Sequence, residues 1–326
     1  MTLAIGLIGC GRAAERYYLP AFARVPDARL AAVADPLDER RNLVAARVAG
    51  CTAFASAEEL LEKAGVAAVI VATPPATHLS TATLAVRAGI PVLVEKPLAP
   101  SMAGVPELAA LVASSRGTVM MGFTRRYWTP VRELRRIMHT HAGDGVSAQL
   151  AITSDAGAWS AISGLGDPLE DLGPHQLDLL RWVFDRDIVA IRARWDQPDA
   201  ISMQVRLAGG IVADCRAAFG TVSGESMLVR GSSLAYGMHA DSERLRPAAG
   251  VVRSFLDLGD RIQRRLRGTP ASAHRSFDAQ LASFCRVVRD GVAADPDLDD
   301  GIAVVRAVEA ARQSADRGGA EVEVPR

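Results

Sequence analysis

Residues 3–14 read Leu3-Ala4-Ile5-Gly6-Leu7-Ile8-Gly9-Cys10-Gly11-Arg12-Ala13-Ala14. A short apolar run leads directly into a G-x-G-x-x-G/A pattern, with alanine in the last small position. The first glycine permits a tight turn, the second lets the backbone approach a pyrophosphate, and the third small residue lets helix and strand pack closely. The following helix would present its N-terminus to the phosphates. We therefore predict a dinucleotide-binding strand–helix unit in which Gly9, Gly11, Arg12 and Ala13 contact the cofactor.

Asp35 ends the second apolar run and supports the same interpretation. Its distance from the glycine pattern is close to the spacing of about 20 residues expected for a carboxylate that binds the ribose 2′-hydroxyl. An acid here favours NAD because it repels a 2′-phosphate, whereas Arg40 and Arg41 lie near enough to leave NADP open. The alternative for Asp35 is a turn residue before Pro36.

The pattern of apolar runs predicts an α/β protein with two domains. Alternating strands and helices in the first part indicate a doubly wound parallel Rossmann sheet. Its strands are expected at Leu3–Ile8, Leu30–Ala34, Ala67–Ala72, Val92–Glu95 and Val119–Gly122, and its helices at Ala13–Ala23, Asp38–Ala49, Glu58–Ala64, Thr77–Ala88 and Met102–Ser114. We place this NAD(P)-binding domain at residues 1–122.

Residues 123–326 are predicted to form an α+β domain for substrate binding and oligomerisation, with a large open, mostly antiparallel sheet. Antiparallel strands are expected at Val146–Thr153, Ile188–Trp195, Ser202–Ala208, Ile211–Ala218 and Glu225–Gly231. The glycines of Ala208-Gly209-Gly210 indicate a hairpin. Two helices are expected at Phe277–Arg289 and Gly301–Arg317, the second capped by Asp299-Asp300.

Composition excludes several classes of function. The net charge is zero, so nothing global attracts nucleic acid or an anionic membrane. No apolar stretch approaches the roughly 18 residues that span a bilayer, and the first run lacks the basic leader of a signal peptide. Four scattered cysteines fit reduced thiols, and His139-x-His141 lacks a nearby acid or cysteine at ligand spacing. We predict a cytoplasmic protein without a metal site.

Two further segments carry candidate cofactor residues. Thr73 and Pro74 end a predicted strand, where they form either a rigid turn under the nicotinamide ribose or a plain strand terminator; His78, just beyond, is a cofactor contact or a helix-start residue. Lys96 follows Glu95 at the end of another strand and is one of only two lysines among 37 basic residues. A lysine amine, unlike a guanidinium, can release its proton, so its retention here indicates chemistry rather than a surface charge.

The segment from Asp171 to Asp178 contains the second candidate site. Gly173-Pro174 is typical of a helix entry, and Asp171 and His175 are four residues apart, so they can share a face. Asp178 is expected to orient the histidine or to anchor the helix.

Together these patterns resemble the glucose–fructose oxidoreductase / inositol dehydrogenase / rhizopine-catabolism (Gfo/Idh/MocA) family over the whole chain. The shared marks are the glycine motif, Ala72-Thr73-Pro74 with His78, Ala88 to Leu98 around Glu95-Lys96-Pro97, Gly122-Phe123-Thr124-Arg125-Arg126-Tyr127, Asp171…His175…Asp178 and Phe277…Phe284…Asp300-Gly301. Three features depart from the pattern: Thr124 replaces a frequent asparagine, Gly166–Glu170 is less glycine-rich, and Ser232–Ala273, with its basic helix Asp260–Gly268, is longer.

The resemblance implies hydride transfer between NAD(P) and a secondary alcohol or ketone of a sugar, nucleotide-sugar or cyclitol. Lys96 would contact substrate and nicotinamide ribose, Asp171 and His175 would bind and deprotonate the hydroxyl, and the Lys96–Pro97 bond would be cis. We also predict a cofactor contact for Glu95, substrate contacts for Arg125, Asp155 and Trp159, and a homodimer or homotetramer formed through the open sheet.

Alternatives on the same fold remain open. They are a redox-assisted epimerase, eliminase or glycosidase with tightly bound NAD, a non-catalytic sugar- or nucleotide-sensing regulator, and a biliverdin-type reductase. The lysine, carboxylate and imidazole favour a polyol dehydrogenase.

Overall fold

The computed structural model describes residues 2–141, 146–155, 166–231, 235–239, 246–247 and 271–325. The chain separates into two compact units, the first formed by Met1–Thr124 with His274–Ile302 and the second by Arg125–Ala273 with Ala303–Arg326. The chain first passes from the first unit to the second between Thr124 and Arg125, close to the boundary expected at residue 122. The sequence-based division did not include the return of His274–Ile302 to the first unit.

The first unit contains a six-stranded parallel sheet in the order β3-β2-β1-β4-β5-β6. Its strands are β1 (Leu3–Ile8), β2 (Ala28–Ala34), β3 (Thr52–Phe54), β4 (Ala68–Val71), β5 (Val92–Glu95) and β6 (Val119–Gly122). The order reverses between β1 and β4, the switch point at which such sheets bind ligands beyond the carboxyl ends of the strands. The predicted doubly wound Rossmann sheet is confirmed; β3 was missed because three residues are too short to show a pattern.

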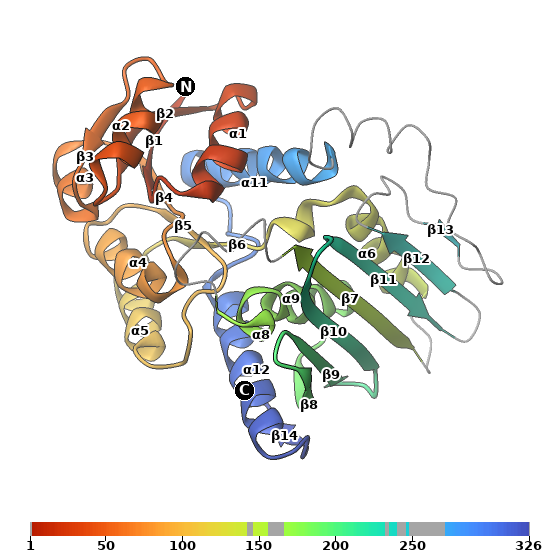
Figure 1. Ribbon diagram of the computed structural model, residues 1–326. Helices are drawn as coiled ribbons and strands as arrows, with labels where there is room; N and C mark the ends of the chain where they lie inside the picture. The colour runs from red at the N-terminus through yellow and green to blue at the C-terminus, as the bar shows by residue number, and fades with distance from the viewer. Residues whose placement is uncertain are drawn as a thin grey trace. The chain divides into compact units, whose positions relative to one another are not determined.

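The helices of this unit follow the strands and cover the sheet (Figure 1). They are the π-helical turn η1 (Ala14–Tyr18), α1 (Leu19–Arg24), α2 (Asp38–Ala46), α3 (Ala57–Lys63), the 3₁₀ turn η2 (Pro75–Thr77), α4 (His78–Arg87), α5 (Val105–Ser115) and α11 (Ala271–Asp290). Helix α11 lies beside α1, and Arg24 pairs with Asp278 at 2.7 Å. The helix expected at Ala13–Ala23 thus begins with a π turn rather than a regular α-helical one.

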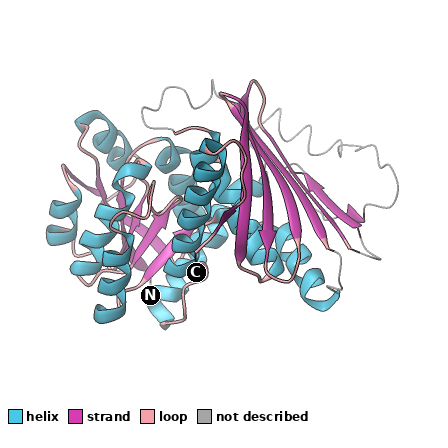
Figure 2. Cartoon of the chain, turned by 90° about the horizontal axis from the view of Figure 1, so that it is seen from below, coloured by secondary structure: helices cyan, strands magenta, loops and turns pink. Residues whose placement is uncertain are grey.

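The second unit contains an eight-stranded sheet in the order β13-β12-β11-β7-β10-β9-β8-β14, seen as a twisted fan in Figure 2. Its strands are β7 (Ser147–Asp155), β8 (Ile188–Gln197), β9 (Ala200–Leu207), β10 (Val212–Gly220), β11 (Gly224–Arg230), β12 (Ala235–His239), β13 (Arg246–Pro247) and β14 (Val322–Glu323). The predicted β9–β10 hairpin is present, with φ of +82° at Gly209 and +81° at Gly210.

The direction of one strand pair differs from the expectation. All five strands recognised in the sequence were taken as antiparallel, but β7 and β10 run parallel. Alternating apolar residues reveal which face of a strand is buried but not the direction of its neighbour. The connection between β7 and β10 is long and includes two helices and a hairpin, which allows the parallel arrangement.

Helices α6 (Thr129–His141), α8 (Pro168–Asp171), α9 (Gly173–Phe184) and α12 (Leu298–Asp316) complete the described elements, together with the 3₁₀ turn η3 (Thr124–Tyr127). Helix α9 packs between α6 and the sheet and is buried from Gly173 to Leu180. The cap of α12 is Asp297 rather than Asp299-Asp300, because the backbone N–H groups of Asp297 and Asp300 each bond to the other's carboxylate, at 3.3 and 3.0 Å.

Candidate active site

The two glycines of the loop after β1 are needed for different structural reasons. Gly9 has φ +97°, and a Cβ there would lie 2.5 Å from the carbonyl oxygen of Ala72 and 2.8 Å from the amide nitrogen of Thr73. Gly9 therefore allows the turn after β1 to touch the turn after β4. A Cβ at Gly11 would meet nothing within 4 Å. The open space at Gly11 fits its predicted role as the point where a pyrophosphate approaches the backbone.

The carboxylate of Asp35, at the end of β2, holds this loop in place. One oxygen accepts a bond from the Cys10 N–H and the other from the Leu37 N–H, both at 2.9 Å. Asp35 is 7% exposed. Each oxygen keeps a second lone pair, so these bonds leave room for a ribose hydroxyl donor. The sequence predicted the ribose contact, whereas the bonds that orient the carboxylate emerge from the structure.

Arg41 is one of the two basic residues that left NADP open, and in the structure its guanidinium contacts other groups. Its guanidinium donates to the carbonyl oxygens of Asp35 and Pro36, each at 3.2 Å, and forms an ion pair with Asp38. These contacts make the Arg41 guanidinium less available to a 2′-phosphate, which favours NAD, whereas they do not involve Arg40.

His78 connects the turns that follow β4 and β5. Its Nδ1 lies 2.7 Å from the carbonyl oxygen of Pro97, and its Nε2 lies 2.8 Å from that of Thr73. Burial lowers the pKa of His78, which is 1% exposed, and the two carbonyl contacts oppose that shift. The imidazole thus joins the Thr73-Pro74 turn to the Lys96–Pro97 segment. Direct cofactor contacts of His78, Thr73 and Pro74 stay predictions.

The two lysines differ as the sequence indicated. Lys63 is exposed and pairs with Glu59 one helical turn away, at 3.2 Å. Lys96 is half-buried at the carboxyl end of β5, and the Lys96–Pro97 peptide bond is cis as the resemblance implied.

Asp171 and His175 lie at the junction of two short helices rather than on one. Asp171 ends α8, Leu172 connects the helices with helical backbone angles, and His175 lies in the first turn of α9 with 8% exposure. Helix α8 begins with an N-cap in which Asp167 accepts from the N–H groups of Leu169 and Glu170, at 2.9 and 3.1 Å. The acid and the imidazole are therefore carried by two elements that are fixed separately.

Arg312 fixes the first of these elements. Its guanidinium pairs with Asp167 and, at 2.8 Å, with Glu170. Trp195 lies against the same guanidinium, 5.5 Å from ring centroid to Cζ. No pattern in the sequence connected Arg312 with the acidic segment.

Gln176 fixes the second element and was also missed. It is fully buried, and its amide donates to the carbonyl oxygens of Leu150 on β7 and Arg216 on β10, at 3.2 and 3.0 Å. These bonds set the rotation of α9 against the sheet and so orient the adjacent His175.

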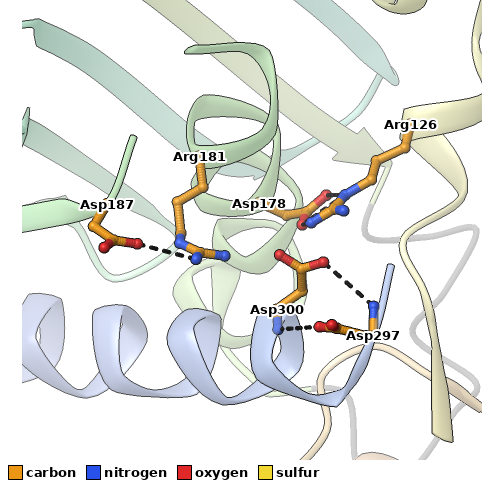
Figure 3. Close-up of polar contacts among 6 residues, drawn as sticks. All are labelled: Arg126, Asp178, Arg181, Asp187, Asp297 and Asp300. Carbon is orange, nitrogen blue, oxygen red and sulfur yellow. Dashed lines mark hydrogen bonds and ion pairs between the residues drawn. The ribbon is translucent and has the colours of Figure 1, made fainter. Parts of the chain in front are cut away.

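Asp178 anchors α9, the second of its two expected roles. Its carboxylate receives the Nε–H of Arg126 at 3.0 and 3.1 Å, together with a bond from the terminal guanidinium nitrogen (Figure 3). Arg126 is 4% and Asp178 1% exposed. The guanidinium of Arg126 also lies 5.8 Å from the ring of Trp182.

The structure describes two of the three remaining substrate candidates, Arg125 and Asp155. Arg125 donates through Nε to both carboxylate oxygens of Glu225 at 2.8 Å, and burial raises the pKa of Glu225. Asp155 ends β7, and its backbone N–H donates to Ser223 Oγ at 3.0 Å. Trp159 lies outside the described residues, as does most of the Ser232–Ala273 segment, including Asp260–Gly268. Substrate contacts of these three residues stay predictions.

Among the residues that the structure describes, no group of three or more His, Cys, Asp or Glu side chains is arranged to hold a metal ion, and no helix is long and apolar enough to cross a membrane. His139 is exposed. The four cysteines are free thiols, and burial raises the pKa of Cys10 to about 12 and of Cys51 and Cys285 to about 11, so these thiols stay protonated and unreactive near neutral pH.

The fold and the glycine loop define a dinucleotide-binding oxidoreductase. Residues 3–123 match the family model described as an oxidoreductase family with an NAD-binding Rossmann fold, and residues 159–324 match that of its C-terminal α/β domain. The chain belongs to the Gfo/Idh/MocA oxidoreductase family. It is an NAD-binding oxidoreductase, as the sequence predicted.

Curated relatives include inositol dehydrogenases. The chain is 28% identical over 333 residues to "Inositol 2-dehydrogenase" of Acidothermus cellulolyticus, covering 96% of this chain and 92% of that protein. A match to "Inositol 2-dehydrogenase 4" of Saccharopolyspora erythraea is 33% identical over 195 residues but spans only 59% of this chain and 57% of that protein.

Solved structures share the fold. Myo-inositol 2-dehydrogenase from Lactobacillus plantarum matches over 100% of both chains with a TM-score of 0.84 at 19% identity. Scyllo-inositol dehydrogenase from Lactobacillus casei, solved with bound NAD(H) and scyllo-inositol, matches over 99% of both chains with a TM-score of 0.81 at 15% identity.

Proposed function

We propose that the protein catalyses reversible oxidation of a secondary hydroxyl of a cyclitol or a closely related polyol, with NAD as the hydride acceptor. The observation that carries the proposal is the placement of Asp171 and His175 at the α8–α9 junction, where each helix is fixed by its own buried or ion-paired contacts. The curated relatives named above are inositol 2-dehydrogenases, which supports a cyclitol within the wider class of sugars and nucleotide-sugars.

His175 is assigned as the general base. A neutral imidazole can take the hydroxyl proton while the carbon loses its hydride. Asp171 would accept a hydrogen bond from the same hydroxyl or from the imidazole and so hold the reacting group in line.

Lys96 is assigned the role of stabilising the charge that develops on the substrate oxygen. As an ammonium group, it stabilises the negative charge on the oxygen as the proton leaves. When bound, NAD would accept the hydride, and the ketone would be the product. Gly9, Gly11 and Asp35 would hold the pyrophosphate and adenosine ribose, since these residues present the open backbone and the oriented carboxylate described above.

A screen of myo-inositol, scyllo-inositol and related polyols and ketosugars against NAD(H) and NADP(H) tests this proposal. Reduction of NAD with at least one cyclitol, measured at the absorbance band of the reduced nicotinamide, is the expected result. Consumption of substrate with flat absorbance would instead indicate redox-assisted chemistry with retained NAD.

Variants of the assigned residues test their roles. Lys96→Ala and His175→Ala should each lower kcat by about 10²–10⁴-fold while NAD binding, measured by calorimetry, persists. The chain offers matched controls in Lys63→Ala and His139→Ala, which remove the other lysine and an exposed histidine. Retained turnover in both Lys96→Ala and His175→Ala would exclude the assignment.

A further inference from the structure

Three hydrogen bonds connect a C-terminal helix to the lysine segment within the first unit. The Gln280 amide donates to the Tyr18 oxygen at 3.2 Å, and the Tyr18 hydroxyl donates to Glu95 Oε1 at 2.6 Å. The other oxygen of the same carboxylate, Oε2, accepts the backbone N–H of Lys96 at 3.2 Å. Tyr18 and Gln280 are fully buried. In this buried, low-dielectric setting, each of these hydrogen bonds is electrostatically stronger than it would be in water.

The donors in this network have a fixed direction. Because the Gln280 amide nitrogen donates to the Tyr18 oxygen, the Tyr18 hydrogen is directed to Glu95. Burial and the adjacent Glu95 raise the pKa of Tyr18 well above its usual value, so the hydroxyl stays protonated and remains a donor. A short O–H···O bond to a carboxylate is stronger than a neutral one.

Two local features bring Tyr18 to this position. The π turn η1 inserts one extra residue directly after the glycine loop, as π turns near functional sites often do. Phe277 of α11 then stacks on Tyr17 at 4.5 Å between ring centroids and meets the edge of Tyr18 at 5.3 Å. Helix α11 therefore brings Gln280 to the Tyr18 hydroxyl.

Gly122 leaves the room that Glu95 occupies. A Cβ at this position would lie 2.9 Å from the Glu95 Cα and 3.0 Å from Oε2. Residues from β6, η1 and α11 thus define one position for the carboxylate that ends β5.

We propose that Tyr18 and Gln280 are positioning residues for Lys96 and act through the carboxylate of Glu95. This inference rests on the proposed catalytic role of Lys96. Loss of the Tyr18 hydroxyl releases one oxygen of Glu95, and the constraint on the Lys96 backbone is lost with it. Since Tyr18 belongs to the turn that follows the glycine loop, the same contact links the cofactor-binding loop to the lysine.

The activity test uses Tyr18→Phe and Gln280→Leu in the full chain, with myo-inositol as the probe. Both should lower kcat by about tenfold or more, because small misplacement of a catalytic group is costly, while the KM for NAD changes little. Asp278→Asn is the matched control on the same helix: it removes the ion pair with Arg24 but leaves Gln280 in place, so kcat should stay close to that of the wild type.

A spectroscopic test does not require turnover. Reductive methylation with ¹³C-formaldehyde labels the two lysines and the chain's amino terminus, and Lys63→Arg identifies the Lys63 signal. We expect the Lys96 signal to move by more than its linewidth in Tyr18→Phe and in Gln280→Leu, while the Lys63 signal and the Asp278→Asn spectrum stay unchanged.

The two tests separate the inference from the proposed function. A shifted Lys96 signal in a protein that oxidises no polyol supports the positioning role and rejects the substrate class. Unchanged Lys96 signals in Tyr18→Phe and Gln280→Leu overturn the inference whatever the activity. If Tyr18→Phe fails to fold, Gln280→Leu alone decides, because it leaves the Tyr18 ring and its packing intact.

Discussion

The two units hold their candidate site residues by different kinds of contact. In the first unit, Asp35 and His78 are fixed by hydrogen bonds to backbone groups of neighbouring turns. In the second, ion pairs also fix the helices: Arg312 with Asp167 at α8, and Arg126 with Asp178 at α9, beside the Gln176 hydrogen bonds. Backbone contacts tolerate changes in the surrounding side chains, whereas a buried ion pair fails when either partner is removed. The second unit should therefore be the more sensitive to single substitutions.

The largest effect is expected for the buried pair in the second unit. Arg126→Met leaves the Asp178 carboxylate in a site that is 1% exposed, which should lower the free energy of unfolding by about 3–5 kcal/mol. Urea unfolding followed by tryptophan fluorescence measures this in the right unit, because Trp128, Trp159, Trp182 and Trp195 all lie in residues 125–273.

The single variants Arg126→Met and Asp178→Leu and the double variant Arg126→Met/Asp178→Leu together form a double-mutant cycle. Replacing both charges by apolar side chains should recover much of the lost stability, since no buried charge remains. If the two single substitutions simply add, the ion pair does not anchor α9 and the proposed contrast between the units is wrong.

A smaller loss of stability, with a large loss of binding, is expected at the glycine loop. Gly9→Ala places a Cβ against the backbone of Ala72 and Thr73 at positive φ, which should destabilise the first unit by about 2–3 kcal/mol and prevent NAD binding. Gly11→Ala meets no protein atom, so its melting temperature should match the wild type while its affinity for NAD, measured by calorimetry, falls. Equal melting temperatures for the two variants would contradict the packing of Gly9.

The smallest expected effect is the pH dependence contributed by His78. Burial lowers the pKa of His78 in the folded state, so below the ordinary histidine value of about 6.5 the unfolded state binds more protons. Stability should therefore fall as the pH decreases from about 7 to 5, by up to about 1.4 kcal/mol per pH unit for this one group.

His78→Gln should flatten that slope in chemical unfolding measured from pH 5 to 8. His139→Gln, at an exposed position, serves as the control and should keep the slope of the wild type. A slope that is unchanged in His78→Gln would show that the imidazole stays protonated between its two carbonyl partners.

Local patterns in the sequence were sufficient for much of the first unit. The apolar runs located β1, β5 and β6 at their observed bounds, and the glycine spacing located the turn that meets Ala72. These strands and this turn depend on residues that are close together in the sequence. The backbone geometry of each strand or turn limits which residues can occupy it. In the second unit the same approach recognised the buried strands and the Gly173 helix entry but missed the parallel β7–β10 pair.

The amino-acid sequence by itself determined the class of fold, the glycine loop with Asp35, and the presence of Lys96, Asp171 and His175. Only the tertiary structure decided what holds them: Arg126 reaches Asp178 across 52 residues, Arg312 reaches Asp167 across 145, and Gln280 reaches Tyr18 across 262. The physical reason is that a turn or a strand is selected by the residues within it, whereas a buried polar side chain is satisfied by whichever partner the folded chain brings to it. The sequence around an arginine or a glutamine does not indicate which residue will be its partner in the folded chain.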